Sequence, residues 1–293
     1  MILAEFAPAK VNLFLHVGPS RADGYHPLAS LMVFADVGDR LVLEPSDRFH
    51  IVVDGPFAGH APPGPDNLVA RAASELFERA DVAPPSLRLT LTKALPAGAG
   101  LGGGSADAAA GLRLLRRAME LEIPVSELLD ICARLGSDIP ACLAAAPVMA
   151  RGRGEVLSDA PVLPVLPAVL VRPDAGSATG PVYRAFDGMD PAGPLEPPPS
   201  PAAFVGVADV VAHLAACRND LQAPAVRLEP RIGEALEALD AAPETLFSRM
   251  SGSGSACFGL CVDMAAAERL ARTLRDHHPS WWVQPCRLGG PWS

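Results

Sequence analysis

The stretch "LPAGAGLGGGSADAAAGL" at residues 95–112 surrounds one serine, Ser105, and one aspartate, Asp107, with glycine and alanine. Glycine has no Cβ, so a loop rich in glycine lets a ligand approach main-chain N–H groups directly. When such a loop precedes a helix, the unpaired N–H groups and the positive end of the helix dipole favour an anion. The stretch therefore predicts a cradle for a phosphate group.

Two further segments could complete such a site. "SGSGSA" at 251–256 is a second glycine turn between two apolar runs, and it could meet the first loop over one phosphate group. "LGSDIP" places Ser137 or Asp138 at the start of a helix, with Pro140 tolerated in the first turn. As a helix cap Asp138 would be ordinary, but beside a phosphate cradle it is a candidate base.

The glycine loop must be weighed against two commoner nucleotide-binding motifs. Gly98, Gly100 and Gly103 satisfy the dinucleotide pattern G-x-G-x-x-G. The loop lies far from the N-terminus, however, and no strand ending in an acidic residue follows at the distance that a dinucleotide fold requires. A P-loop is excluded because no lysine follows the last glycine. A tight connection without a ligand would also fit one glycine, but several are costly in chain entropy.

Hydrophobic periodicity predicts the elements that must position these segments. Alternating residues predict strands at 10–17, within 41–54, at 86–93 and 165–171, on both sides of the second glycine turn, and in "WWVQPC". Helical spacing predicts helices near 66–80, 105–119, 207–216, 229–240 and 264–276, and a helix pair that turns at Gly136. The segment 22–28 is predicted to be a loop, and the proline- and glycine-rich stretch 187–203 a mobile loop or linker.

Composition limits the classes of partner. The chain has 293 residues and a formal net charge of −9, which is enough length for one large or two modest domains. Proteins that neutralise many nucleic-acid phosphates are normally basic, so no nucleic acid is expected. No signal peptide or membrane-spanning stretch is evident. The six scattered cysteines fit reduced core thiols, and we expect a cytoplasmic protein with no membrane partner.

Seven segments, in order along the chain, resemble the motifs of the GHMP small-molecule kinases. They are "PAKVNLFLHV", "ADGYHPLASLM", "KALPAGAGLGGGSADAAAGL", "LGSDIP", "GRGEVL", "RNDLQ" and "MSGSGSACFG". The pair "PAKVNL" and "DGYH" is more specific than the glycine loop, and it resembles the branch that acts on a cytidine-diphosphate-linked polyol. The resemblance, which runs from Phe6 to about Gly259, implies transfer of the γ-phosphoryl group of ATP, with Mg²⁺, to a hydroxyl of that small molecule.

The resemblance also implies roles for individual residues in ATP binding and catalysis. Lys10 and Asp138 match the catalytic lysine and aspartate of the family. It assigns no protein metal ligand, although Ser105 is a candidate to contact the Mg²⁺ of ATP. The residues that match the ATP-binding positions are Asn67, Lys93, Pro96, Ala97, Gly98, Ala99, Gly100, Leu101, Gly102, Gly103, Gly104, Ser105 and Ala106.

Four further residues match the positions that bind the second substrate. Asn12 lines the site, Tyr25 and His26 fall in the cytidine pocket, and Tyr183 aligns with an aromatic residue that stacks on cytosine. A flat pyrimidine ring with a hydrogen-bonding edge suits aromatic and histidine side chains.

The implied fold is α+β and two-lobed, with the active site between the lobes. We expect a mainly β/α N-terminal lobe over 1–160 and an α+β C-terminal lobe over 161–293. Another GHMP kinase, acting on homoserine, mevalonate or a sugar, would leave "DGYH" unexplained. A catalytically silent ligand sensor on the same fold would have lost Lys10 or Asp138, and both are present.

Overall fold

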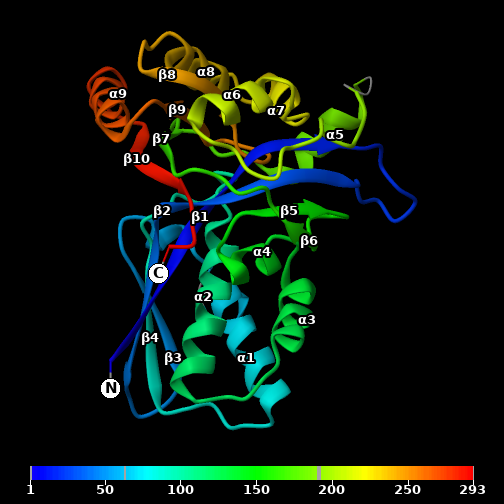
Figure 1. The fold of residues 1–293 in the computed structure, drawn as a ribbon. Coiled ribbons are helices and arrows are strands. Elements are labelled where there is room, and N and C mark those ends of the chain that lie inside the picture. The colour runs from blue at the N-terminus through cyan, green and yellow to red at the C-terminus, as the bar shows by residue number, and fades with distance from the viewer. Residues whose placement is uncertain (1, 63, 190–192, 293) are drawn as a thin grey trace.

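The computed structural model describes residues 2–62, 64–189 and 193–292. Within these ranges, ten strands form one mixed sheet (Figure 1) in the order β3-β4-β2-β10-β7-β9-β8, with β1 and the β5–β6 hairpin paired to β2. The strands are β1 (Leu3–Val17), β2 (Leu28–Pro45), β3 (His50–Asp54), β4 (Leu87–Thr92), β5 (Val148–Arg151), β6 (Val156–Asp159), β7 (Leu166–Arg172), β8 (Thr245–Met250), β9 (Cys257–Cys261) and β10 (Trp282–Gly289).

The helices lie in two groups, below and above the long strands of Figure 1. The lower group is α1 (Leu68–Ala80), α2 (Gly103–Ala118), α3 (Val125–Leu135) and α4 (Ile139–Ala144). The upper group is α5 (Thr179–Asp187), α6 (Val207–Ala215), α7 (Gln222–Leu228), α8 (Arg231–Asp240) and α9 (Met264–His277). Two short 3-10 helices, η1 (Ala58–His60) and η2 (Gly64–Asp66), precede α1. The α+β, two-lobed expectation is confirmed.

The antiparallel pair β1–β2 runs through both halves of the molecule (Figure 1). Its register shifts between Pro8 and Lys10 and again between Asn12 and Phe14. Such bulges redirect side chains locally. Between the two shifts, Lys10 and Asn12 stand two residues apart and therefore share one face of the strand. The predicted catalytic lysine thus lies on the strand pair that both halves share.

Helix packing explains the alanine part of the stretch 95–112. The alanines from 106 to 110 are buried, and a Cβ at Gly111 would lie 3.0 Å from Cγ1 of Val69 on α1. Small side chains let α1 and α2 approach closely and pack over the lower part of the sheet (Figure 1). The glycines from 98 to 104 precede this contact, so a different explanation is needed for them.

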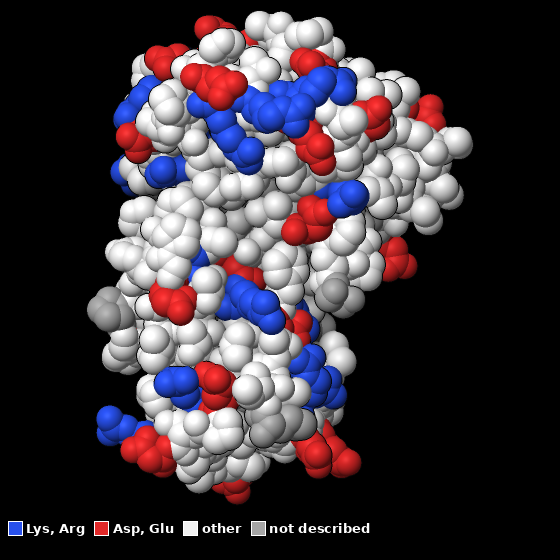
Figure 2. Space-filling view, turned by 90° about the vertical axis from the view of Figure 1, so that its left-hand side faces the viewer, with Lys and Arg blue, Asp and Glu red and all other residues white. Residues whose placement is uncertain are grey.

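The upper half joins the lower half through β10. This strand pairs with β7 along its length and with β2 through Leu288 and Gly289. The sheet is therefore continuous across the position of the expected lobe boundary at 160/161, which remains a prediction. On the face seen in Figure 2, basic side chains gather over the upper half with acidic ones among them.

Most of the predicted strands and helices are confirmed, and so is the loop 22–28 between β1 and β2. Sequence periodicity does not predict α5, α7 or the β5–β6 hairpin, because each is short. Of the stretch 187–203, residues 190–192 lie outside the described residues, and 193–203 form a loop with one isolated bridge at Ala203. The six cysteines are free and buried, as predicted. No helix in the described ranges is long and apolar enough to cross a membrane.

Candidate active site

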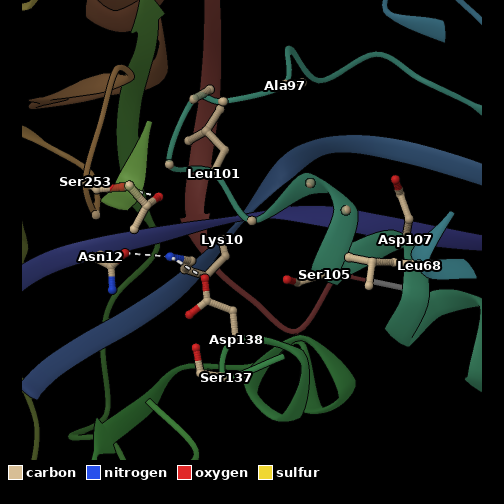
Figure 3. Close-up of a pocket in the computed structure, with 18 of the residues that line it drawn as sticks. Lys10, Asn12, Leu68, Ala97, Leu101, Ser105, Asp107, Ser137, Asp138 and Ser253 are labelled. Atoms are coloured by element: carbon tan, nitrogen blue, oxygen red, sulfur yellow. Dashed lines mark hydrogen bonds and ion pairs between the residues drawn. The ribbon is translucent and has the colours of Figure 1, made fainter. Parts of the chain in front are cut away.

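Lys10 borders a cavity of about 450 Å³ that is also lined by the glycine loop. Its ammonium group donates a hydrogen bond to Asn12 Oδ1 at 2.6 Å and lies 3.2 Å from Asp138 Oδ2 (Figure 3). The lysine side chain is 4% exposed, whereas that of Asp138 is 33% exposed. The pair therefore combines a fixed positive charge with a carboxylate that a ligand can reach.

Asp138 occupies the N-cap position of α4 but does not cap the helix with its side chain. A capping carboxylate would accept a hydrogen bond from an N–H of the first turn. The Asp138 carboxylate faces Lys10 instead, and Pro140 lies in the first turn as expected. The ordinary role of a helix cap therefore does not account for this side chain.

The two glycine turns meet directly behind Lys10. The N–H of Ala256 donates to the carbonyl of Ala99 at 2.9 Å, and the Ser251 hydroxyl donates to the carbonyl of Gly100 at 3.1 Å. Gly100 has φ of +71°, and a Cβ there would lie 2.4 Å from the Ser251 carbonyl oxygen. Only glycine fits this approach of two backbones. The predicted meeting of the two turns is observed.

Asn12 connects this junction to Lys10. Its side-chain amide donates to Ser30 Oγ at 2.8 Å while its Oδ1 accepts from Lys10, and its main-chain N–H donates to Ser251 Oγ at 3.1 Å. Asn12 thus binds Lys10 through Oδ1, Ser30 of β2 through its amide nitrogen and the second glycine turn through its main-chain N–H. Asn12 lines the cavity, as predicted, and its Oδ1 helps to position Lys10.

The N-terminus of α2 opens into the same cavity. Gly102, with φ of +64°, is the N-cap residue, and the first intrahelical bond runs from the N–H of Ala106 to the carbonyl of Gly102 at 2.8 Å. The N–H groups of Gly103, Gly104 and Ser105 precede that bond and are available to an anion. Residues 96–105 line the cavity, whereas Ala106 is buried in the core outside it.

Lys93 is held by two buried carboxylates. Its ammonium pairs with Asp39 and lies 2.6 Å from Asp107 Oδ2, while Asp39 Oδ1 accepts from the N–H groups of Ala94 and Leu95 at 2.6 and 2.8 Å. Burial works to lower the pKa of Lys93, but the charges of Asp107 and Asp39 outweigh it and raise that pKa. Burial and the Asp39 charge raise the pKa of Asp107 well above its ordinary value.

Neither carboxylate partner of Lys93 is a predicted site residue. Asp39 comes from β2, 54 residues before Lys93, and only the strand register brings the two together. Asp107 lies inside the conspicuous glycine–alanine stretch, but sequence gives it no partner. In the structure, Lys93 binds two buried carboxylates at the base of the glycine loop. Its contact with the nucleotide remains a prediction.

Asn67 lies in the cavity lining and caps α1. Its Oδ1 accepts from the N–H of Val69 at 2.9 Å, and its amide nitrogen donates to the Pro62 carbonyl at 3.2 Å. Both polar atoms of the side chain are thus engaged within the chain, and a contact with the nucleotide remains a prediction.

A second cavity of about 1100 Å³ adjoins the first and contains the predicted cytidine-binding residues. Tyr25, His26 and Tyr183 all line it. Burial, together with the charge of Asp138, raises the pKa of Tyr183 to about 12. The lining residues common to both cavities are Leu28, Ser137, Arg153, Thr179 and Tyr183.

Tyr25 and His26 differ in how firmly they are held. Tyr25 is 53% exposed, with the Arg153 guanidinium 4.6 Å from its ring centroid. His26 is buried, with Nδ1 2.9 Å from the Gly18 carbonyl and Nε2 3.2 Å from Asp187 Oδ1. The resemblance gave no role to Arg153 or Asp187, although Arg153 lies in the quoted segment "GRGEVL".

The donor set near the cradle suits Mg²⁺ bound mainly through phosphate and water. In the parts of the chain that the structure describes, no three His, Cys, Asp or Glu side chains are grouped to hold a metal ion. The Ser105 hydroxyl points toward the side of the cavity that holds Lys10 and Asp138 (Figure 3). A hydroxyl and one carboxylate are oxygen donors of the kind that Mg²⁺ accepts while keeping several waters.

Comparison with known proteins places the chain in a family. The family of GHMP kinases matches through its N-terminal domain at residues 67–145 and its C-terminal domain at 209–280. The 4-diphosphocytidyl-2-C-methyl-D-erythritol kinase of Caulobacter sp. (strain K31) is 53% identical over 292 residues, covering 99% of this chain and 100% of that protein. The chain belongs to this family of kinases. The protein of the same name from Paramagnetospirillum magneticum is 46% identical over 283 residues, which cover 96% of this chain and 97% of that protein.

Solved structures agree with this family. A crystal structure of 4-(cytidine 5'-diphospho)-2C-methyl-D-erythritol kinase superposes with a TM-score of 0.81 at 36% identity, covering 99% of this chain and 100% of that chain. Homoserine kinase from Cytophaga hutchinsonii gives a TM-score of 0.67 at 18% identity, with 99% and 94% covered. The second likeness is one of fold alone. The recognition of the kinase family from sequence motifs is thus confirmed.

The contact between the two glycine turns can be tested with a matched pair of alanine variants. Gly98 has φ of +63°, and a Cβ there would meet nothing closer than 3.8 Å, so Gly98→Ala should cost about 1–2 kcal/mol from backbone strain. Gly100→Ala adds a backbone clash and should cost about 1–3 kcal/mol more. Urea unfolding of both variants measures the difference. Equal losses would contradict the close approach at Gly100.

The raised pKa of Asp107 predicts a pH-dependent stability. A carboxyl group whose pKa is higher in the folded state binds its proton more tightly when folded, so wild-type stability should fall as pH rises from the ordinary Asp value of about 3.9 through the folded pKa. Asp107→Asn lacks this proton, so its free energy of unfolding relative to wild type should increase over that pH window. Urea unfolding at mildly acidic and neutral pH measures it. Asp159→Asn, which removes an exposed carboxylate, is measured alongside as the control for loss of a carboxylate, and a constant difference for Asp107→Asn would refute the expectation.

Proposed function

We propose that this chain transfers the γ-phosphoryl group of ATP to a hydroxyl of 4-diphosphocytidyl-2-C-methyl-D-erythritol, in the non-mevalonate route to isoprenoid precursors. The observation that carries the proposal is the pair of adjoining cavities. One holds the glycine loop, Lys10 and Asp138, and the other holds Tyr25 and His26. A substrate with a polyol at one end and a cytidine at the other needs a site with two such parts.

The ATP end of the reaction is assigned to the first cavity. Free N–H groups at the start of α2 and the positive end of its dipole hold the phosphates, and Lys10 adds a charge beside the transferred group. Phosphoryl transfer depends mainly on such positioning and charge neutralisation. Mg²⁺ supplies further neutralisation of the phosphates when bound, and Ser105 is the residue we propose to contact it.

The acceptor hydroxyl is assigned to Asp138. Its carboxylate, one-third exposed and next to the Lys10 ammonium, can accept the proton of the alcohol or orient the hydroxyl toward the phosphoryl group. The lysine lies between the carboxylate and Asn12 and keeps the carboxylate at a fixed place in the cavity. Both partners of the reaction thus meet at one ion pair.

The cytidine end is assigned to the second cavity, with Tyr25 and Tyr183 as stacking residues. A substrate that spans both cavities must pass its diphosphate through the region lined by the five shared residues. Within the described residues, Arg153 is the single cation among those five. Its guanidinium, in the turn between β5 and β6, donates no hydrogen bond there and lies 3.7 Å from Glu155. We assign Arg153 to the substrate diphosphate.

The competing functions make different demands on the site. A kinase for homoserine, mevalonate or a sugar has no use for an aromatic second cavity, and a silent sensor would not need the Lys10–Asp138 pair. An assay of ADP release with Mg-ATP and a panel of these alcohols decides between them. Turnover of mevalonate or homoserine in preference to the cytidine compound would contradict the proposed substrate. The lobe boundary at 160/161 and a cytoplasmic location remain predictions.

Asp138→Asn tests the assigned chemistry. We expect turnover to fall by roughly a hundredfold to ten-thousandfold, which is the usual contribution of a proton-transferring group. Affinity for ATP should change little, because the carboxylate faces the acceptor. Steady-state kinetics and calorimetry with ATP measure the two effects, with the exposed Asp159→Asn as a control. Wild-type turnover in Asp138→Asn would reduce Asp138 to a structural residue.

Arg153→Gln tests the path of the diphosphate. The KM for the cytidine substrate should rise about tenfold, since a charge-assisted contact is lost, while the KM for ATP stays unchanged. Arg151→Gln is the matched control, because Arg151 lies on the same hairpin outside both cavities and pairs with Glu196 at the surface, 3.0 Å away. Similar kinetics for the two variants would remove Arg153 from the site.

A further inference from the structure

The segment "RNDLQ" at 218–222 is attached to β1 through its main chain. It connects α6 to the start of α7, and Asn219 forms an isolated parallel bridge with Leu15. The N–H of Leu15 donates to the Arg218 carbonyl at 2.8 Å, and the N–H of Asp220 donates to the Leu15 carbonyl at 2.9 Å. The segment is therefore fixed to the strand that carries the assigned catalytic lysine.

The Asn219 side chain reaches from this segment to the second glycine turn. Its amide nitrogen donates to the carbonyls of Met250 and Gly252 at 2.7 and 2.9 Å, and its Oδ1 accepts from the N–H of Leu221 at 3.0 Å. The N–H of Met250 donates to Gln222 Oε1 at 3.0 Å. Asn219 is 9% exposed, so these bonds form largely out of contact with water.

This arrangement needs an amide side chain of this length. An amide combines two N–H donors on one nitrogen with an acceptor oxygen. An aspartate of the same shape has no N–H to donate, and a serine hydroxyl has one hydrogen. The two carbonyls flank a single residue, Ser251, so one nitrogen can bind both. Loss of the amide would remove a donor from both carbonyls at once.

The part of the turn that is held in this way lies against the groups that hold Lys10. Gly252 has φ of +58°, and a Cβ there would lie 3.2 Å from Asn12 Oδ1 and 3.3 Å from the Gly100 carbonyl oxygen. Asn12 Oδ1 is the atom that accepts from the Lys10 ammonium. Ser251 Oγ accepts from the N–H of Asn12 and donates to the Gly100 carbonyl. A shift of this turn would therefore displace both the lysine and the glycine loop.

The far end of the same turn is held by other side chains. Ser177 Oγ donates to the Ser253 carbonyl at 2.7 Å, and Ser255 Oγ donates to the Ala175 carbonyl at 2.5 Å. These bonds fix the turn to the segment between β7 and α5. The bonds from Asn219 act on the first half of the turn, which is the half that contacts the lysine strand.

We propose that Asn219 is a positioning residue for phosphoryl transfer, which acts on Lys10 and the glycine loop through the second glycine turn. Among the described residues that line the two cavities, Asn219 is absent, so it acts without touching either substrate. Groups that neutralise the transferred phosphoryl are effective only when they are already in place. This inference rests on the proposed function, because it assigns the first cavity to ATP.

Asn219→Ala and Asn219→Ser are the first test, in steady-state kinetics with Mg-ATP and the cytidine compound. Both variants lose the amide, but serine keeps an oxygen that can accept from the N–H two residues on and so preserves the local turn. In both, kcat should fall about tenfold, the equivalent of two neutral hydrogen bonds. The KM for the cytidine compound should stay unchanged, because the described lining of the second cavity includes no residue of 250–256. Wild-type kcat in Asn219→Ser overturns the proposal.

Asp220→Asn is the matched control. The buried Asp220 carboxylate accepts from the N–H of Val17 at 2.8 Å and pairs with Arg218 at 2.8 Å, so it holds the same segment on β1. Within the described residues it forms no hydrogen bond with the second glycine turn. Urea unfolding gives the stability of each variant. A merely structural Asn219 would lower the free energy of unfolding and leave kcat as in Asp220→Asn, and that result overturns the proposal.

Gln222→Met provides the test if the Asn219 variants do not fold. This half-buried side chain loses the acceptor for the N–H of Met250 and keeps its length. We expect kcat to fall about threefold, the equivalent of one neutral hydrogen bond. An unchanged kcat in Gln222→Met overturns the proposal.

Binding of an ATP analogue gives a readout that needs no acceptor substrate. In calorimetry with Mg²⁺ and adenosine 5'-(β,γ-imido)triphosphate, the affinity should fall about tenfold in Asn219→Ala and stay unchanged in Asp220→Asn. Equal affinities of wild type and Asn219→Ala overturn the proposed positioning. Wild type that binds the analogue but does not phosphorylate the cytidine compound contradicts the proposed function instead, and the affinities still decide the role of Asn219.

Discussion

The approach of two backbone turns at Gly100 and Ser251 is the constraint on which the site depends. The strand β1 is hydrogen-bonded to both turns, through the N–H of Lys10 to the Leu101 carbonyl at 2.8 Å and through the N–H of Asn12 to Ser251 Oγ at 3.1 Å. The glycine loop, the lysine strand and the late glycine turn thus form one rigid unit from three distant parts of the sequence. Rigidity of this kind is what electrostatic catalysis requires, because groups that are already oriented need not reorganise during the reaction.

Two buried lysines in this unit have opposite surroundings. Lys93 has two carboxylate partners that are themselves buried, whereas Lys10 has one carboxylate partner that is one-third exposed. Burying an unpaired charge costs several kcal/mol, so the enclosed triad of Lys93 is suited to fixing the base of the loop. The Lys10–Asp138 pair is partly exposed, so Lys10 can give up part of its interaction with Asp138 when a phosphate binds. Lys93, which is structural, and Lys10, which we assign to catalysis, thus differ in the number and the exposure of their carboxylate partners.

Local sequence patterns predict the strands, the long helices and the glycine loops because each depends on neighbours in the chain. They also predict the cradle and offer Asp138 as a candidate base, whereas Lys10 follows only from the resemblance of its motif to the kinase family. They do not predict Asp39 as a partner of Lys93, since that contact depends on the pairing of β2 with β4. The sequence does not predict the contact between Asp187 and His26 for the same reason, because α5 is short and the contact is tertiary. The sequence alone also leaves Asp138 between a helix cap and a base; the direction of its side chain excludes the cap, and its part in catalysis remains a prediction.

The position of β10 in the sheet has a consequence for how the molecule is made. This strand is synthesised after every other strand of the sheet, yet it lies in the middle, between β2 and β7. Trp292, just beyond it, donates to the Phe34 carbonyl of β2 at 2.7 Å. The sheet can therefore become continuous from β2 to β7 only once residues 282–289 have left the ribosome. Until then β7 exposes an unpaired edge along residues 166–172, and β2 lacks partners at Phe34 and Ala35. Such edges are where partly folded chains associate wrongly.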